Sequence, residues 1–278
     1  ALTVTGLTNG TRYAFALRAV NAAGNGAAAT ATATPSSSDT TPPQVASITR
    51  QTPSTSPTNA DSLTWEVTFS EPVQNVDALD FQVSGTTALI TSVSQILNTD
   101  AYAVTTSGGN LVSLDDTVTL SFKASHDIRD MARNALVSTK PTGTNHPSYV
   151  VDNTAPSVPS ITHQTPSSSP TNADSLTWEV TFSEPVQNVD AADFQVSGTT
   201  DHITFVSQVS STNDYYVTTS GDDLVSLEDT VTLSFKASHD IRDMAGNALP
   251  PSTTPTNNDS FVVDNTAPTV TINGLSGT

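Results

Sequence analysis

The clearest alternation of apolar and polar residues lies at 62–69. Every second residue from Leu63 to Phe69 is large and apolar, and the residues between them are Thr, Glu and Thr. This period of two is typical of a β-strand with one buried face and one solvated face. The surrounding stretch, Ser56–Ala78, returns unchanged as Ser169–Ala191, so each residue has its counterpart 113 positions later. The chain therefore contains the same core strand, with the same flanking turns, twice.

Segments of this kind recur through the first repeat. We expect strands at 44–49, 62–69, 79–84, 88–96, 101–106, 117–124 and 147–151. Residues 117–124 alternate cleanly, whereas Ala88–Val93 changes parity, which predicts a bulge. Seven short strands separated by turn-rich loops are typical of an immunoglobulin-like sandwich. We therefore predict an all-β fold of tandem immunoglobulin-like sandwiches, with about seven strands in each.

Residues 1–35 predict two further strands, Tyr13–Val20 and Ala27–Ala33, joined by a turn rich in Gly and Asn. The run GLTNGTRY, which ends at Tyr13, and the following AVNAAG, 19–24, resemble the last third of a fibronectin type III domain. On this resemblance Tyr13 is the corner tyrosine, whose hydroxyl binds nearby backbone. Because two strands cannot form a sandwich alone, we expect 1–35 to be the C-terminal fragment of such a domain, cut from a longer chain.

Segments rich in proline and serine divide the chain. Proline cannot donate to a sheet ladder and serine has little to bury, so the first linker is placed at 36–43. The motif VDNTAP marks the later junctions, at Val151–Pro156 and Val263–Pro268. The predicted boundaries are 1–35, 36–43, 44–151 (repeat 1), 152–263 (repeat 2) and 264–278, the last being the start of a third repeat.

Four motifs of repeat 1 support a resemblance that spans the whole domain. They are TFSEPV at 68–73, DFQV at 80–83, DMARN at 130–134 and YVVDNTAP at 149–156. Together they resemble the bacterial Ig-like domains that are arrayed in large surface proteins and adhesins. Repeat 2 has Gly246 where repeat 1 has Arg133, which restores the family's Asp-x-Ala-Gly-Asn loop. If this position requires a positive φ, Arg133 is strained and Gly246 is not.

The chain carries 27 acidic residues against nine Lys and Arg, a formal net charge of −18. This charge argues against nucleic acid and anionic membrane as partners, since both would repel it, and it is compatible with cation binding. No apolar run approaches the length that spans a membrane. The chain has no cysteine, so disulfides do not stabilise it.

Acidic residues are expected to gather where two repeats meet. In immunoglobulin order, the B–C, D–E and F–G loops lie at the pole where each domain begins. For repeat 2 and the adjoining end of repeat 1, the candidates are Asp152, Glu184, Asp214, Asp240, Asp243, Asp115 and Asp116. A weaker equivalent in repeat 1, opposed by Arg133, consists of Asp39, Glu71, Asp100, Asp127 and Asp130.

Two interpretations of these acids remain open at this point. Convergent carboxylates repel one another unless a cation lies among them, and Ca²⁺ accepts about six to eight oxygen ligands from flexible loops. The functional interpretation is therefore an interdomain calcium site that stiffens the array. In the structural interpretation, Asp side chains cap turns through nearby backbone and are otherwise solvated.

Candidates for catalysis or sugar binding have simpler explanations. Trp65 and Trp178 share the parity of buried strand residues, which places them in the core rather than on a sugar-stacking surface. His126 and His239 precede aspartates, but the chain offers no Cys, no second His nearby and no nucleophile elbow. We therefore predict no catalytic residue, no cofactor other than calcium, and no enzyme.

The resemblances imply an extracellular spacer or stalk in a cell-surface adhesin or filament. Its partners would be the neighbouring domains of the same chain, with any protein or glycan ligand bound by other modules. One alternative is an accessory region of a secreted polysaccharide-degrading enzyme. Another is direct ligand binding by repeat 2, where Phe205 and Tyr216 replace Ser92 and Ala103, although ordinary packing of the two rings is the expectation.

Overall fold

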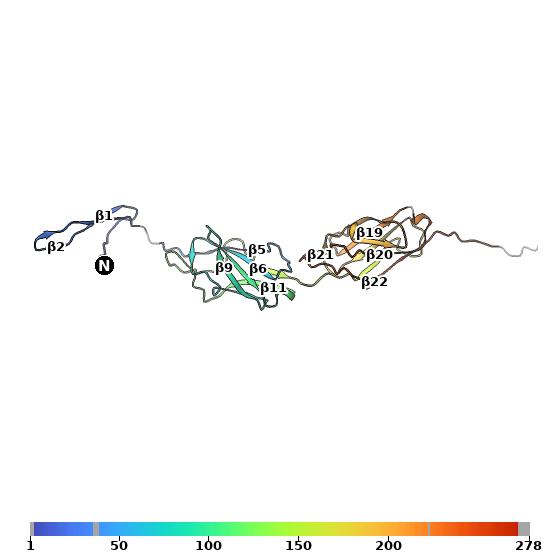
Figure 1. Cartoon of the computed structure of the whole chain (residues 1–278), viewed down its shortest axis with the longest axis horizontal. Coiled ribbons are helices and arrows are strands. Elements are labelled where there is room, and N and C mark those ends of the chain that lie inside the picture. Colours follow the sequence, from blue (N-terminus) through green and yellow to red (C-terminus); the bar gives the residue numbers. More distant parts are fainter. Residues whose placement is uncertain (1–2, 36–38, 222, 272–278) are drawn as a thin grey trace, which may run out of the picture.

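The computed structural model describes residues 3–35, 39–221 and 223–271, and it is all-β. Its only helical segments among these residues are single 3₁₀ turns at Leu111–Ser113, Ala191–Asp193 and Leu224–Ser226. Figure 1 shows two strand-rich units that follow one another along the long axis of the molecule, with a hairpin at the N-terminal end. The predicted all-β class is confirmed.

The N-terminal hairpin pairs β1 (Tyr13–Leu17) with β4 (Ala29–Ala33), and its tip pairs β2 (Val20–Asn21) with β3 (Gly24–Asn25). The hydroxyl of Tyr13 accepts a hydrogen bond from the backbone N–H of Thr8, at 2.9 Å. The hydroxyl therefore binds nearby backbone, which is the contact expected of it.

Repeat 1 forms two main sheets. The strands are β5 (Val45–Thr52), β6 (Ser62–Phe69), β8 (Phe81–Ser84), β9 (Leu89–Gln95), β10 (Ala101–Ser107), β11 (Asp116–Phe122) and β13 (Ser148–Val151). One sheet has the order β5-β6-β10-β9 and the other β13-β11-β8, while β7 (Val73–Gln74) pairs with β12 (Arg129–Asp130). Each of the predicted strands is present. The bulge is present too, since Thr105 pairs with Ser92 and the next residue pairs with Ile90.

Repeat 2 has the same arrangement with one additional short strand, β22 (Asn257–Asn258), at the edge of its larger sheet. Its strands are β14 (Ser160–Thr165), β15 (Ser175–Thr181), β16 (Val186–Gln187), β17 (Phe194–Ser197), β18 (Ile203–Gln208), β19 (Asp214–Ser220), β20 (Glu228–Phe235), β21 (Arg242–Asp243), β22 (Asn257–Asn258) and β23 (Phe261–Asp264). The sheets have the orders β18-β19-β15-β14-β22 and β17-β20-β23. Residues 265–271 contain no strand. The rest of the expected third repeat, 272–278, lies outside the described residues.

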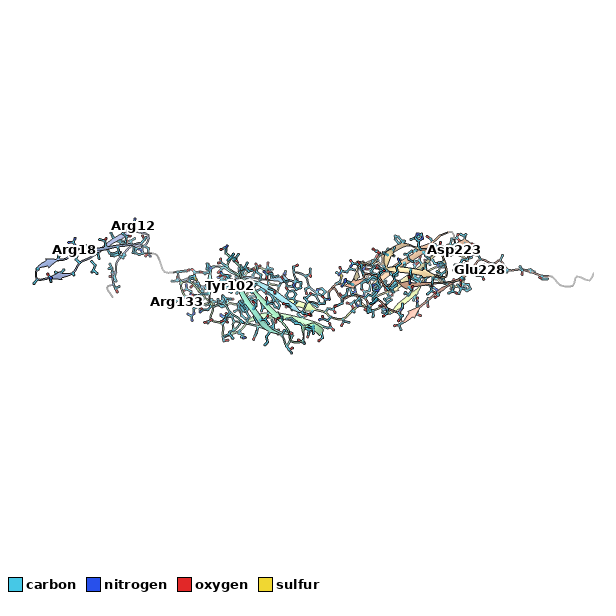
Figure 2. The ribbon with its side chains drawn as sticks, in the orientation of Figure 1. Arg12, Arg18, Tyr102, Arg133, Asp223 and Glu228 are labelled. Carbon is cyan, nitrogen blue, oxygen red and sulfur yellow. The ribbon has the colours of Figure 1, made fainter. Side chains whose placement is uncertain are left out.

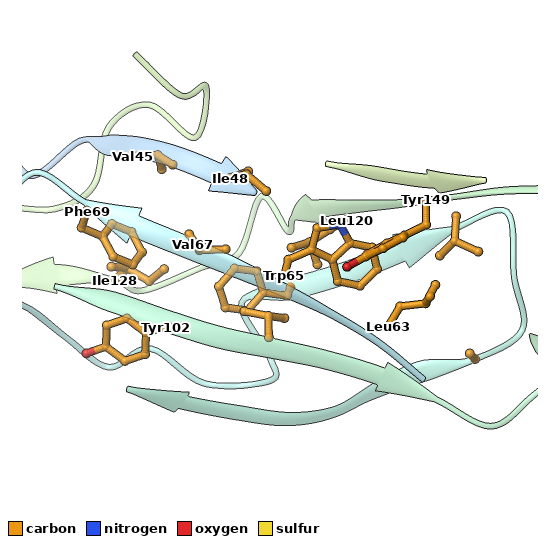
Figure 3. Close-up of a cluster of buried hydrophobic side chains, with 14 of the residues drawn as sticks. Val45, Ile48, Leu63, Trp65, Val67, Phe69, Tyr102, Leu120, Ile128 and Tyr149 are labelled. Atoms are coloured by element: carbon orange, nitrogen blue, oxygen red, sulfur yellow. The ribbon is translucent and has the colours of Figure 1, made fainter. Parts of the chain in front are cut away.

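Each repeat encloses its own hydrophobic cluster, to which both of its main sheets contribute. At the centre of repeat 1 the fully buried Trp65 meets the ring of Tyr149 edge to face, with centroids 5.1 Å apart (Figure 3). Trp178 and Phe261 form the counterpart pair at 5.0 Å. The tryptophans therefore belong to the core, as expected, and they do not form sugar-stacking surfaces.

The aromatic pair of repeat 2 differs from the expectation of ordinary packing. Phe205 is 57% exposed, and its partner across the ladder is Thr218 rather than Tyr216. The bulge in β18 shifts the register between Ile203 and Phe205, which turns the ring away from the core.

The loop after β12 contains an unusual backbone conformation. Arg133 has a φ of 76°, and its counterpart Gly246 has a φ of 103°. An L side chain in this region crowds its own backbone, whereas glycine adopts it freely. The positive φ on which the expected strain at Arg133 depends is therefore present.

Replacing Arg133 with glycine should stabilise repeat 1. We expect Arg133→Gly to raise its free energy of unfolding by about 1 kcal/mol, the cost of a left-handed non-glycine residue. Urea unfolding measures the change. Arg129→Gly is the control, because it removes the same charge from a strand residue and should destabilise. Equal effects of the two substitutions would show that charge, rather than backbone strain, decides the outcome.

Candidate interdomain acidic site

Three carboxylates from separate parts of the chain meet where repeat 2 begins. Asp152 follows β13, Glu184 lies in the turn between β15 and β16, and Asp243 ends β21. One carboxylate oxygen of each lies within 4.8 Å of the others. We call this group cluster 2.

Asp243 organises the loop that follows it. Its side chain is fully buried, and Oδ1 accepts hydrogen bonds from the backbone N–H groups of Gly246 and Asn247, at 2.6 and 2.8 Å. The side-chain amide of Asn247 donates to Oδ2 at 2.8 Å. The same amide donates to the backbone oxygen of Asp152 at 2.8 Å. Asp243 therefore positions the amide that binds the linker.

Glu184 has no such partners, because its carboxylate accepts no hydrogen bond from the described residues. Burial raises the pKa of Glu184 above its ordinary value, and the negative charges of Asp152, Asp243 and Asp115 raise it further. No Lys or Arg of the described chain forms an ion pair with the cluster. Its negative charge is therefore left without a side-chain counter-ion.

Repeat 1 contacts repeat 2 directly through Asn59, which lies between β5 and β6. Its side-chain amide donates to Oδ1 of Asn247, at 3.0 Å, and its backbone N–H donates to the oxygen of Ala245, at 3.2 Å. These two bonds join the end of one repeat to the beginning of the next. We call this contact, together with cluster 2, the joint.

The linker is also bound to the end of repeat 1. The side-chain amide of Asn153 donates to the backbone oxygens of Leu111 and Leu114, at 2.9 and 2.8 Å. Asp115 accepts from the hydroxyl of Thr154 at 2.7 Å and from the N–H of Asn153 at 2.6 Å, and these bonds lower the pKa of Asp115. Residues 152–154 are therefore hydrogen-bonded to both repeats.

The equivalent cluster of repeat 1 consists of Asp39, Glu71 and Asp130, again with carboxylate oxygens within 4.8 Å of one another. Burial raises the pKa of Glu71, followed by the charges of Asp39, Asp130 and Asp100. The amide of Asn134 donates to Oδ2 of Asp130 at 2.7 Å, as Asn247 does to Asp243. We call this group cluster 1.

The other predicted acids are not brought into a cluster. Asp127 and Asp240 donate their backbone N–H to the buried carboxylates of Asp80 and Asp193, which cap a different turn. Asp116 starts β11 and accepts from the next N–H.

Asp214 and Asp100 also lie outside the two clusters, and the strand register shows that they are not counterparts of each other. Asp214 pairs with Thr181 in the ladder, as Ala101 does with Thr68, so the counterpart of Asp100 is Asn213 rather than Asp214. Asp100 raises the pKa of Glu71 through its charge without joining the cluster. The loops lie at the pole predicted from the sequence, but strand order alone does not determine which side chains within them face one another.

Sequence reasoning also missed the amides that build the joint: Asn59, Asn153 and Asn247. Each lies inside a repeated motif, so the signal was present in the stretch that contains Asn59 and in the DMAGN and VDNTAP motifs. The pattern of charged residues does not reveal these amides, because an amide donates hydrogen bonds without changing the net charge.

Chemically, cluster 2 is a set of oxygen donors suited to a hard divalent cation. Its three carboxylates can supply three to about six ligand oxygens, and water completes the coordination of Ca²⁺ in such loops. A cation would also remove the repulsion that raises the pKa of Glu184.

No family model matches the chain, and no curated protein matches it significantly. Among the described residues, no helix has the length and apolar character needed to cross a bilayer.

Cluster 2 should make stability depend on pH. The folded-state pKa of Glu184 lies above its ordinary value of 4.5. The contribution of protonated Glu184 to the free energy of unfolding is therefore complete below pH 4.5, and it is lost as the pH rises through the raised pKa. Without divalent cations, Glu184→Gln should therefore raise the free energy of unfolding at pH 7, by about 0.5–1 kcal/mol for a partly solvated group. Chemical unfolding from pH 4 to 7, a range that begins below the ordinary pKa of 4.5, measures the change. Glu179→Gln, which removes a charge on β15 and outside the cluster, should retain the wild-type pH slope, and equal slopes in both variants would contradict the assignment.

Proposed function

We propose that this chain is a non-enzymatic spacer segment of a large extracellular modular protein, such as a surface adhesin or filament. The observation that carries the proposal is the joint. Asn59 of repeat 1 is hydrogen-bonded to the Ala245–Asn247 loop of repeat 2, and the linker between them is bound on both sides. A spacer needs this property, because an array of domains transmits position only if its linkers do not bend freely.

Each repeat is best described as an Ig-like sandwich. The strand order supports this assignment: in repeat 1 the first, second, fifth and fourth main strands form one sheet, and the seventh, sixth and third form the other. This is the ABED and GFC arrangement of constant-type immunoglobulin domains. Such domains are independent cores that can be strung in series, and the N-terminal hairpin fits the end of a fibronectin type III domain.

Calcium is the proposed stiffening ligand of the joint. Cluster 2 supports it because three carboxylates from the linker and two loops converge without a cationic side chain. A bound ion would connect Asp152 of the linker to Glu184 and Asp243 of the next domain. Bending the joint would then require breaking ion–oxygen contacts as well as hydrogen bonds.

Spin-label distances test the joint itself. The chain has no cysteine, so Gln82→Cys and Gln195→Cys provide unique labelling positions in the two repeats. We expect a narrow distribution of distances between the labels and a clearly broader one after Asn59→Ala. The matched control is Asn172→Ala, which changes the counterpart of Asn59 at the other end of repeat 2 and should leave the distribution narrow. A broad distribution in the unmodified chain would rule out the spacer joint.

Calcium binding has its own test. At about 100 times the dissociation constant, calcium that binds only the folded state adds about 2.7 kcal/mol, equivalent to a rise of about 10 °C in Tm for a domain of this size. Fluorescence of Trp178 in a Trp65→Phe background reports repeat 2 alone, since the chain has two tryptophans. Asp152→Asn with Glu184→Gln should abolish the rise.

The control for this test is Glu179→Gln with Asp214→Asn, which removes the same charge away from the cluster. Its rise in Tm should equal that of the unmodified chain. An unchanged Tm of the unmodified chain between chelator and millimolar calcium would refute the calcium site while leaving the hydrogen-bonded joint to the spin-label test.

A further inference from the structure

The joint has two sides, and the end of repeat 2 carries a second copy of the first side. On repeat 1, Asn59 is presented by its neighbour Thr58, whose N–H donates to the oxygen of Val150 and whose oxygen accepts from the N–H of Asp152, both at 3.0 Å. On repeat 2, Thr171 makes the same two bonds with Val262 and Asp264, both at 2.9 Å.

The outgoing segment repeats the pattern as well. Asn265 donates its amide to the oxygens of Leu224 and Leu227, and its N–H to Glu228, as Asn153 does to its own repeat. Figure 2 shows Glu228 at the end of repeat 2 that points away from repeat 1. The backbone that presents Asn172 is therefore formed in the same way as the backbone that presents Asn59.

Asn172 itself is exposed and has no hydrogen-bond partner among the described residues. Its counterpart Asn59 donates two hydrogen bonds, to Asn247 and Ala245. We call Thr171, Asn172 and Asp264 the free pole. It repeats the backbone arrangement and the asparagine that repeat 1 contributes to the joint.

The partner that this surface fits can be specified from the joint. A Cβ atom added to Gly246 would lie 3.5 Å from Oδ1 and 3.7 Å from Nδ2 of Asn59, so the amide rests against the bare backbone of the glycine. A methyl group there would be in ordinary van der Waals contact with the amide, so the atoms beyond Cβ of a long side chain such as arginine would compete with Asn59 for the space beside this loop. Arg133 occupies the same position in repeat 1, at the opposite end of that repeat from the joint (Figure 2).

We propose that the free pole is a docking surface for a further Ig-like repeat whose loop reads Asp-x-Ala-Gly-Asn, and that the residue at the glycine position decides whether docking occurs. Glycine accepts the asparagine, and arginine excludes it. The occupant is thus a domain of the repeat 2 type and not of the repeat 1 type. The proposal rests on the proposed function of the repeats as a jointed spacer, and it assigns a specific partner to the free pole.

The proposal can be tested with an extended chain that carries one more repeat. A copy of residues 160–271 is appended after Thr271, so that Asn172 faces the Gly246 loop of the appended repeat across a linker aligned with the existing one. A second version carries Gly246→Arg in the appended copy only. This version retains a foldable repeat, since repeat 1 already contains arginine there. The side-chain amide resonances of Asn59 and Asn172 are followed by NMR in the original chain and in both extended chains.

We expect the amide of Asn172 to shift towards that of Asn59, and its hydrogen exchange to slow by about tenfold, in the glycine version alone. Asn172→Ala in that version should restore independent tumbling of the appended repeat. No change at Asn172, or the same change in both versions, would overturn the proposal. The amide of Asn59 is the internal reference: if it is protected while Asn172 is not, only this inference fails, and if neither is protected, the spacer joint fails as well.

Discussion

The side-chain amide of Asn247 is the group on which the arrangement of the two repeats depends. It donates to the buried carboxylate of Asp243 and to the backbone of Asp152, while its oxygen accepts from Asn59. One planar amide thus connects a loop of repeat 2, the linker and repeat 1. Because Asp243 is fully buried and bound to the backbone of the same loop, the amide is held in place before the repeats meet. Little conformational entropy is lost when the contact forms.

The electrostatics of the same region oppose that contact. Asp243 binds the backbone of its own loop, and it also places a negative charge beside Glu184 and Asp152. Burial raises the pKa of Glu184, and the charges of Asp152, Asp243 and Asp115 raise it further. A proton or a divalent cation would relieve the repulsion among these charges, and protons are scarce at neutral pH. The joint therefore combines a neutral hydrogen-bonded contact with a charged group that favours cation binding, and the two properties can be separated by substitution.

Much of the fold follows from the sequence, because alternation along strands reports burial directly. The strands, the bulge in β9 and the burial of Trp65 were predictable on this basis. For the acidic site, the sequence predicts only the end of the domain at which the acids lie. It does not predict which side chains meet there, because loop side chains have no periodicity that fixes their direction. Asp240 shows the difference: it lies at the expected pole, but its backbone N–H binds the carboxylate of Asp193 and its own carboxylate is not part of cluster 2. The exposure of Phe205 was missed for a related reason, since the bulge that reverses its face changes the ladder by one residue.

The central claim is that repeats 1 and 2 are held in one relative orientation by the joint. Residual dipolar couplings of backbone amides in weakly aligned samples test this most directly, because each repeat reports its own alignment. With millimolar calcium, the account predicts that one alignment tensor fits the couplings of 45–151 and 158–263 together. Two tensors of clearly different magnitude would show that the repeats reorient independently, and would contradict the account.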